Sequence, residues 1–434
     1  MIFQLEAETL ASSHRRKLQG ERLVALLERL KAVNTPYWRQ KLAGFHDIDR
    51  IERITELPFT VKDELRDTYP FDMLAVPLDD TVRVHASSGT RGKPTVVSYT
   101  SGDVQIFAEV NARSIACAGG GPGDVFHIAY GYGLFTGGLG LHYGAERLGA
   151  TAVPASGGNA SLQLQLMVDL SAAGLAATPS FAMLLAEKAG ALGLLDQINL
   201  RYGVFGAEPW SDAYRVKLEE AWGGIDACDI YGLSEVIGPG VAMECWEEKA
   251  GLHVFEDHFY PEIVDPVTGE PVEGDQTGEL VLTTLTKEAQ PVLRYRTGDI
   301  TSIIDEPCRC GRTFRKIGRI LGRADDMLIV RGVNVFPREL EAMILADPDL
   351  GGQYAIIVDR RGTLTELRIS AEVVSPQAMS RAPEITGRLQ RRLTANTRLR
   401  VAVELQPPGS MPRPEVGKAK RVFEQTSDRD PLQG

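Results

Sequence analysis

The chain has 434 residues, of which 43% are hydrophobic and 24% charged, a composition that excludes wholesale disorder and predicts about two to three domains with large buried cores. The net charge of −11 disfavours nucleic acid and anionic membranes as partners. Five cysteines in so long a chain argue against a disulfide scaffold and favour a reducing compartment.

Two stretches of the chain bear on targeting and on membrane insertion. The N-terminal sequence MIFQLEAETL has neither the basic residues nor the apolar run of a signal peptide. The apolar stretch at residues 125–145 contains His127, His142 and several glycines, which excludes a membrane span. We therefore expect a soluble, cytoplasmic protein.

The first predicted element is an amphipathic helix at residues 20–33, where four leucines recur at helical spacing before Pro36. Between residues 103 and 204, helical patterns alternate with short β-rich runs, which predicts βαβ units and a mainly parallel sheet. The elements expected up to this point are strands at 82–86, 125–129, 150–154 and 201–205 and helices at 103–118 and 160–173.

The pattern changes further along the chain. Residues 252–305 contain strand patterns at 263–265, 278–284 and 300–304 with turns and no helix between them. Residues 351–434 mix strands and helices, and glycines punctuate residues 318–332. The last expected elements are helices at 338–346 and 383–394 and strands at 354–358, 367–371 and 400–404.

These patterns together predict an α/β fold with two domains. The large N-terminal domain, residues 1–324, is expected to hold mainly parallel sheets flanked by helices, with a β-rich subdomain at about 252–320. After a boundary near residues 320–335, residues 325–434 are expected to form a small α+β domain.

A loop rich in hydroxyl groups and glycine follows the strand at 82–86. Backbone N–H groups, hydroxyls and cations in such a loop can surround phosphate oxygens, although a surface turn has the same composition. The loop is not a Walker A motif, because Ser87 and Pro94 stand where that motif needs Gly and Ser or Thr. The candidate phosphate ligands are Ser87, Ser88, Gly89, Thr90, Gly92 and Lys93.

The segment SSGTRGKPT resembles the phosphate loop of adenylate-forming enzymes, the superfamily of acyl-CoA synthetases, adenylation domains and luciferases. The motifs AYGYGLFTGGLGLHYGAERLG, FGAEPW, IYGLSE, EDHFYPEI, LRYRTGD and GRADDMLIVRGVNVFP resemble those of the phenylacetate–CoA ligase family. The resemblance covers roughly residues 55–425 in the order of the family. One departure is Arg91, where the family usually has Thr.

The resemblance implies a nucleotide site built from several motifs. Glu235 is implied as the Mg²⁺ ligand and as a catalytic residue, and a hydroxyl beside a carboxylate past a strand end suits Mg²⁺ with triphosphate. Tyr231 is implied to stack on adenine, and Asp299 to accept the ribose hydroxyls with Arg323 nearby. The remaining residues implied to bind ATP or AMP are Gly206, Ala207, Glu208, Pro209, Asp229, Gly232 and Ser234.

The resemblance also implies a moving domain. Asp325 aligns with the hinge about which the C-terminal domain turns between two half-reactions, and Gly-flanked acidic residues suit such a hinge. Lys418, in the pattern Gly-Lys, is implied as the adenylation lysine, with Lys420 as the alternative. An ammonium group there offsets repulsion between the carboxylate and the α-phosphate, although most charge runs are only solvated tails.

Aromatic residues and glycines at 130–140 suit a flat apolar pocket, although core packing explains them equally well. The candidates for the acyl pocket are Tyr130, Phe135, Gly206, Ala207, Ile237 and Pro239.

The cysteines allow a metal site. Cys308 and Cys310 form a C-x-C knuckle, and Cys245 precedes His253 by eight residues. Three thiolates and one imidazole suit tetrahedral Zn²⁺ in a structural site. Reduced cysteines without metal are the alternative.

The sequence thus predicts an ATP-dependent aryl-CoA ligase that forms an acyl-adenylate and then a CoA thioester of phenylacetate or of a benzoate- or anthranilate-type acid. The alternatives are an enzyme that loads an aryl acid onto a carrier protein and a non-enzymatic nucleotide-binding protein. Expected cofactors are ATP, Mg²⁺ and coenzyme A, with Zn²⁺ and homodimer formation left open.

Overall fold

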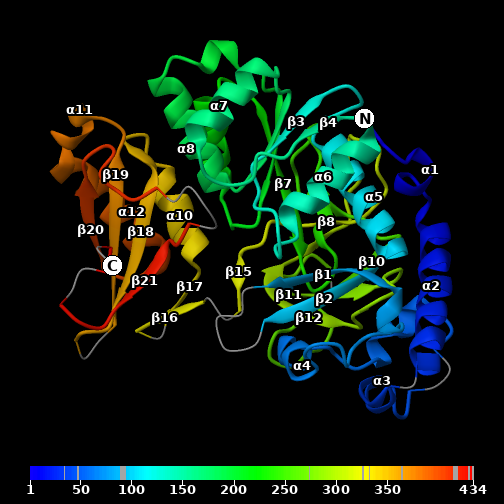
Figure 1. Cartoon of the computed structure of the whole chain (residues 1–434). Helices are drawn as coiled ribbons and strands as arrows, with labels where there is room; N and C mark the ends of the chain where they lie inside the picture. Colours follow the sequence, from blue (N-terminus) through cyan, green and yellow to red (C-terminus); the bar gives the residue numbers. More distant parts are fainter. Residues whose placement is uncertain are drawn as a thin grey trace.

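The computed structural model describes residues 1–33, 35–45, 48–87, 94–272, 274–324, 327–331, 333–362, 365–413, 419–428 and 431–432. Its architecture is the predicted mixture of helices and sheets, with helices covering the largest sheet (Figure 1). The described helices include none that is long and apolar enough to cross a membrane.

The largest sheet has nine strands. They are β3 (Val125–Ile128), β4 (Thr151–Val153), β5 (Gly174–Ala177), β6 (Tyr202–Gly206), β7 (Asp226–Leu233), β8 (Gly238–Glu244), β9 (Leu252–Val254), β13 (Ile303–Ile304) and β14 (Lys316–Ile317). The order is β13-β14-β9-β8-β7-β6-β5-β3-β4. Strands β3 to β7 pair in parallel, and the other neighbours are antiparallel.

Helices connect the parallel strands, which confirms the predicted βαβ alternation. They are α6 (Gly137–Leu148), α7 (Ala160–Asp169), α8 (Pro179–Ala191) and α9 (Asp212–Ala221), with the short η3 (Leu195–Gln197) after α8, while α5 (Ser101–Cys117) leads from β2 into β3. The helix predicted at 160–173 ends earlier, because Ser171 adopts a φ of 51°. Strand β5, with the sequence Gly-Leu-Ala-Ala, was not predicted, since small residues have weak β-propensity.

Helix α6 was also not predicted, because its sequence GGLGLHYGAERL is rich in glycine. Packing explains the glycines. A Cβ at Gly144 would lie 2.5 Å from the Cβ of Asn111 on α5, and a Cβ at Gly140 would lie 2.5 Å from the Phe107 ring. Glycine therefore allows α5 and α6 to approach closely, at a cost in intrinsic helix propensity.

Two antiparallel sheets lie beside the large sheet. One pairs β1 (Thr81–Ser87) with β2 (Thr95–Thr100). The other has the order β10 (Phe259–Val264), β11 (Gly278–Thr284), β12 (Tyr295–Thr301) and β15 (Gly322–Arg323). Strand β11 has the bounds predicted from the sequence, and all of its residues are buried.

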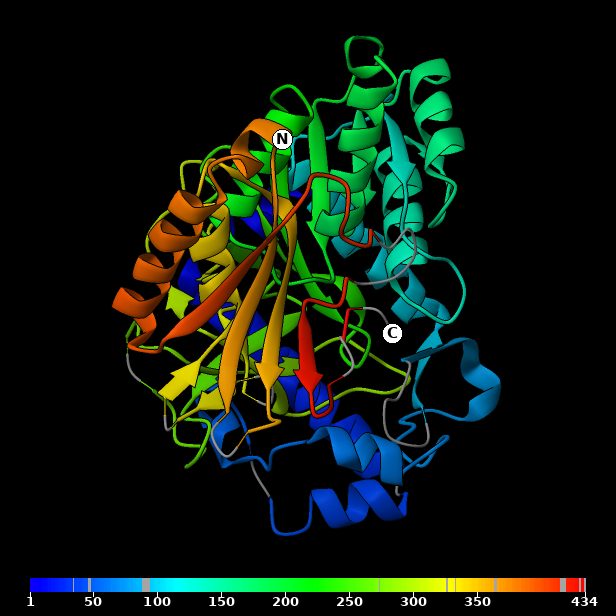
Figure 2. The same ribbon diagram turned by 90° about the vertical axis from the view of Figure 1, so that its left-hand side faces the viewer.

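The C-terminal part forms its own sheet. After the hairpin of β16 (Leu328–Val330) and β17 (Val333–Val335), its elements are α10 (Pro337–Leu345), β18 (Leu350–Asp359), β19 (Glu366–Val373), α11 (Pro376–Met379), α12 (Ala382–Thr397), β20 (Val401–Gln406) and β21 (Val422–Gln425). The sheet order is β20-β19-β18-β21. Figure 2 looks onto this sheet, which lies in front of the rest of the chain.

The N-terminal elements are α1 (Leu5–Glu8), α2 (Ser12–Val33), α3 (Pro36–Lys41), η1 (Ile51–Glu56), α4 (Lys62–Asp67) and η2 (Leu78–Asp80). The four leucines of the predicted helix are buried along α2, as expected. Helix α2 starts earlier than predicted, because its polar first turns are held by tertiary contacts. The Gln19 amide, for example, donates to the Glu256 carbonyl at 2.9 Å.

The apolar core forms two clusters. The first joins α2 with one side of the large sheet and with β10 to β12. The second joins α7, α8 and α9 with α10, α12 and the C-terminal sheet. The C-terminal elements therefore bury apolar surface against the helices that lie beside β6 and β7, which places them next to the carboxyl ends of these two strands.

Candidate functional site

The predicted phosphate loop follows β1. Ser87 is the last residue of β1 and pairs with Thr95 of β2. The other candidates of this loop, Ser88, Gly89, Thr90, Gly92 and Lys93, lie outside the described residues. The described pairing places the two ends of the loop side by side.

The carboxyl ends of β6 and β7 lie side by side in the large sheet, where α/β proteins commonly bind ligands. A Cβ at Gly206, the last residue of β6, would lie 2.2 Å from the Ile230 carbonyl of β7, so only glycine fits there. The next residue, Ala207, has a φ of 67°. The Tyr130 hydroxyl donates to the Gly206 carbonyl at 3.1 Å. Two of the predicted pocket segments therefore meet at this edge.

Glu235 follows β7 and has a nearly buried side chain. Its carboxylate lies 3.3 Å from the Lys62 ammonium, and the residue is only 6% exposed. The hydroxyl of the neighbouring Ser234 lies 3.2 Å from that of Thr136. A carboxylate at a strand end is of the type that Mg²⁺ prefers alongside phosphate oxygens.

A buried lysine that the sequence analysis missed lies next to this segment. Lys287 donates to the Val236 carbonyl at 3.1 Å, and its ammonium lies 4.4 Å from the centre of the Tyr99 ring. Burial lowers the pKa of Lys287 to about 8, opposed by Asp103 and Glu235. No motif surrounds this residue in the sequence, so only its burial next to Val236 and Glu235 indicates a role.

Three of the predicted nucleotide ligands come together from separate strands. The Tyr231 hydroxyl of β7 donates to the Asp299 carboxylate of β12 at 2.6 Å. Arg323 of β15 lies 3.4 Å from the same carboxylate. Burial raises the pKa of Tyr231 well above its usual value, and the negative charge of Asp299 adds to that rise. Tyr231 is therefore a neutral donor that orients the Asp299 carboxylate.

Glu208 connects three segments. Its carboxylate accepts the Ser180 hydroxyl at 2.8 Å and the Ser180 N–H at 3.2 Å, both at the start of α8. It also accepts the N–H of Ala419. Burial raises the pKa of Glu208, and these hydrogen bonds oppose the rise. Through the bond to Ala419, Glu208 links the loop after β6 to the C-terminal segment. Pro209 follows Glu208 directly in this loop.

The predicted lysine and hinge have described neighbours. Lys418 and Asp325 themselves lie outside the described residues. Ala419 is held by Glu208, and Ala324 donates to the Gly298 carbonyl at 2.7 Å. The ammonium of Lys420, the alternative lysine, lies 4.9 Å from the centre of the Phe423 ring on β21.

The remaining site candidates are distributed as follows. Asp229 on β7 is 3.9 Å from Arg319, and burial raises the pKa of its carboxyl. At Gly232, a Cβ would lie 2.0 Å from the Gly238 carbonyl, so β7 and β8 approach closely there. Ile237 is buried, and its carbonyl accepts the Tyr99 hydroxyl at 2.9 Å.

The last two candidates for the acyl pocket differ in their surroundings. A Cβ at Gly140 would lie 2.9 Å from Pro239, so the start of β8 contacts the segment at 130–140. Phe135 is 40% exposed, which is more than core packing would give. Exposure of this ring is therefore consistent with the wall of an open pocket.

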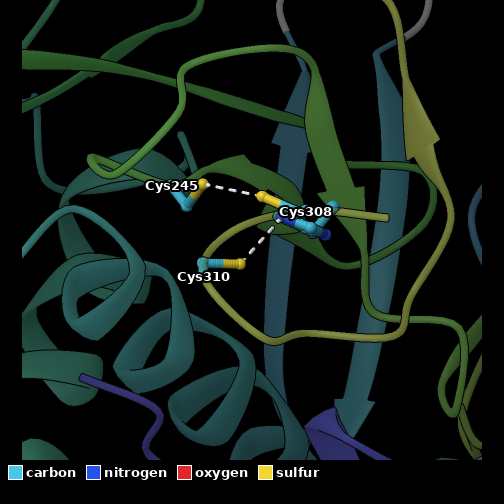
Figure 3. A group of neighbouring side chains, drawn as sticks. Cys245, Cys308 and Cys310 are labelled. Carbon is cyan, nitrogen blue, oxygen red and sulfur yellow. Dashed lines mark hydrogen bonds between the residues drawn. The ribbon is translucent and has the colours of Figure 1, made fainter. Parts of the chain in front are cut away.

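The four predicted metal ligands come together. One donor atom from each of Cys245, His253, Cys308 and Cys310 lies within 4.8 Å of the others. Figure 3 shows the three cysteine side chains pointing toward one another. The two halves of the set, more than 50 residues apart in the sequence, meet because β9 pairs with β14.

Comparison with known proteins decides the family. The profile of the AMP-binding enzyme family matches residues 20–285, and that of the AMP-binding enzyme C-terminal domain matches residues 332–426. The chain belongs to the AMP-binding enzyme family.

Curated relatives within this family place the chain more closely. It is 48% identical to a phenylacetate-coenzyme A ligase of Thermus thermophilus, over 98% of this chain and 99% of the relative. It is 47% identical to a phenylacetate-coenzyme A ligase of Escherichia coli, over 96% of each. These relatives confirm the predicted membership of the phenylacetate–CoA ligase family, and neither the carrier-protein alternative nor the non-enzymatic one gains support.

Solved structures of a 2-hydroxyisobutyryl-CoA ligase share the fold. In the postadenylation state with R3-HIB-AMP, that enzyme matches with a TM-score of 0.89 and 27% identity, over 97% of this chain and 92% of the other. In the thioesterification state with CoA, the TM-score is 0.72 at 28% identity, over 97% and 91%. The arrangement of this chain is therefore closer to the postadenylation state.

Proposed function

We propose that this AMP-binding enzyme is an aryl-CoA ligase that activates an aromatic carboxylic acid with ATP and transfers the acyl group to coenzyme A. The observation that carries the proposal is the convergence of Tyr231, Asp299 and Arg323 beside the carboxyl ends of β6 and β7.

The proposed reaction has two steps. A carboxylate oxygen of the acid attacks the α-phosphorus of ATP, and the bond to pyrophosphate breaks, which leaves an acyl-adenylate. The sulfur of coenzyme A then attacks the acyl carbonyl carbon, the bond to the AMP oxygen breaks, and the thiol proton is released. The acyl-adenylate supplies the leaving group that a free carboxylate lacks, so no protein nucleophile is needed.

Each nucleotide residue has a proposed task. Asp299 accepts the ribose hydroxyls while Tyr231 and Arg323 orient its carboxylate, and the Tyr231 ring stacks on adenine. The loop of residues 206–209 lies along the base through its backbone, and the loop after Ser87 holds phosphate oxygens. Glu235 provides a carboxylate for Mg²⁺, which when bound would offset the charge of the triphosphate. The nearby Lys62 supplies a further positive charge.

We infer that residues 1–324 and 325–434 are separate domains, with a β-rich subdomain at about 252–320, and that Asp325 is the hinge. The contact of Glu208 with Ala419 supports a C-terminal domain that docks on the N-terminal one. It holds Ala419, the residue after Lys418, against the loop after β6. In the proposed cycle this contact accompanies adenylation, with Lys418 offsetting the charge between carboxylate and α-phosphate. It breaks when the C-terminal domain turns for thioester formation.

Glu208→Ala should slow adenylation by about 10-fold while thioester formation from supplied acyl-adenylate stays near the wild-type rate, because a hydrogen bond to a charged group is worth roughly 1.5–3 kcal/mol. Pyrophosphate exchange and single-turnover thioester formation measure the two steps. Ser180→Ala is the matched control, since it removes only the hydroxyl that donates to Glu208, keeps the Ser180 N–H donor and leaves Ala419 untouched. Equal loss in both steps would show that Glu208 acts elsewhere.

We propose an aromatic acid as the substrate for two reasons. The pocket candidates Tyr130 and Phe135 are aromatic, and the relatives are named for phenylacetate. In a panel of acids, phenylacetate should give a kcat/KM at least about 10-fold above that of benzoate, because one methylene group in an apolar pocket is worth roughly 1–3 kcal/mol. Pyrophosphate release and mass spectrometry of the acyl-CoA product measure this. A preference for aliphatic acids would contradict the proposed class.

The proposed partners are therefore small molecules: the acid, ATP and coenzyme A. We also propose that a Zn²⁺ ion at the cysteine–histidine cluster is structural, because the reaction needs no open metal position. Homodimer formation stays a prediction, which light scattering of the purified protein would measure.

A further inference from the structure

We propose that Cys245, His253, Cys308 and Cys310 bind one Zn²⁺ ion and that this ion holds the N-terminal segment in place. Cys245 Sγ lies 3.4 Å from Cys308 Sγ, and Cys310 Sγ lies 3.4 Å from His253 Nε2. Tetrahedral Zn²⁺ with ordinary bond lengths requires separations of about 3.8 Å between two sulfurs and about 3.6 Å between sulfur and nitrogen. Small side-chain shifts therefore bring all four donors to bonding distance.

His253 is oriented as a zinc ligand. Its Nδ1 lies 3.3 Å from the Phe314 carbonyl, and its Nε2 faces Cys310. A carbonyl can only accept a hydrogen bond, so Nδ1 is the donor, and a neutral imidazole in this tautomer offers the Nε2 lone pair to a metal. Zinc-bound histidines typically have this second hydrogen bond, which sets the tautomer and the orientation of the ring.

Hydrogen bonds hold the turn that carries Cys308 and Cys310 in a defined conformation. Gly311 has a φ of 85°, and its N–H donates to the Cys308 carbonyl at 3.1 Å. The N–H of Arg309 donates to the Glu248 carboxylate at 2.8 Å. These contacts fix the backbone where Cys308 and Cys310 meet Cys245 (Figure 3), with the donor atom of His253 within 4.8 Å of all three sulfurs.

A disulfide is the main alternative for this cluster. The sulfurs of Cys245 and Cys308 are 3.4 Å apart, and all five cysteines are free thiols, whereas a disulfide requires about 2.05 Å. A disulfide would also leave the third thiol and the imidazole without a reason to face the same point. Three sulfurs and one nitrogen around one centre favour Zn²⁺ among the common metals.

The residues directly after the knuckle hold the N-terminal segment. The Arg312 guanidinium forms an ion pair of 2.6 Å with Glu8, and both side chains are fully buried. Arg312 also donates to the Met1 carbonyl at 2.8 Å. The N–H of Thr313 donates to the Glu8 carbonyl at 3.0 Å, and Arg15 donates to the Thr313 carbonyl at 2.7 Å. We call residues 312–313 the N-terminal clamp.

Zinc ligation would fix the clamp on both sides. Cys310 precedes the clamp by two residues, and Phe314, whose carbonyl faces His253, follows it directly. Three thiolates with Zn²⁺ carry one net negative charge, and the cationic Arg312 follows Cys310 by two residues. Loss of the ion would remove the bonds that hold the four side chains together and would loosen the clamp.

The first experiment measures the metal. Protein purified without added metal should contain about one Zn²⁺ per chain by elemental analysis, and the Co²⁺-substituted protein should show the visible bands of tetrahedral cobalt with thiolate charge transfer. The Cys308→Ser/Cys310→Ser variant should lose the ion. Cys228→Ala is the matched control, because it removes a buried thiol of β7 outside the cluster, and it should keep the ion.

The second experiment measures the clamp by hydrogen exchange with and without a zinc chelator. Removing the ion should increase exchange in residues 1–15 and 308–315 by at least about 10-fold, while exchange in β18 and β19 should not change. Metal-free protein whose five thiols all titrate would overturn the site. Zinc that leaves without any change in residues 1–15 would overturn its role in holding the N-terminal segment. Neither readout depends on ligase activity.

Discussion

Glu235→Gln is expected to lower the rate of acyl-adenylate formation by at least about 10²-fold, because one charged contact to the transition state is worth a few kcal/mol. The substitution keeps the shape of the side chain and removes its charge. Glu235 is nearly buried next to Lys62, so little solvent is available to replace the lost carboxylate. ATP–pyrophosphate exchange with an aryl acid at saturating Mg²⁺ measures the effect.

The control for this prediction is Glu146→Gln, which neutralises an exposed glutamate on α6 that contacts only His142 among the described ion pairs. It should leave the exchange rate unchanged. Thermal unfolding of both variants checks that the fold is retained. If Glu235→Gln exchanges at the wild-type rate when Mg²⁺ is saturating, Glu235 does not bind the metal.

Lys418→Ala is expected to reduce adenylation by about 10²- to 10³-fold and to leave thioester formation from supplied acyl-adenylate nearly intact. The reason is that the proposed domain movement withdraws this lysine before coenzyme A reacts. Lys420→Ala is the matched control, because the Lys420 ammonium lies over the Phe423 ring. Pyrophosphate exchange and single-turnover thioester formation again separate the steps.

The hinge variant should give the opposite pattern. Asp325→Pro restricts φ to about −65°, so we expect adenylation to persist while overall turnover drops because the domain rotates poorly. A general loss of stability would lower both half-reactions in both variants. Should Lys420→Ala abolish adenylation and Lys418→Ala spare it, the assignment of the two lysines would be reversed.

Local sequence was sufficient to predict features that lie within one short segment. The leucine spacing of α2 predicts a helix that the structure confirms, because burial of one face imposes a regular period. The short β-rich run between turns predicts β11 with its observed bounds. The motif SSGTRGKPT predicted the family together with the other motifs, which follow one another along the chain in the order of the family. Three cysteines and one histidine also indicated four donors suited to zinc. The sequence could not give the distances between their donor atoms.

By itself, the sequence determined the fold class, the family and most of the candidate residues. The tertiary structure alone decided which of them touch. Tyr231 and Asp299 are 68 positions apart, and Glu208 and Ala419 are 211 apart. Arg312 and Glu8 are separated by 304 positions, and Lys287 shows its burial only in the folded chain. Such pairs have no local period or spacing, because strand order and helix packing bring them together after the chain has folded.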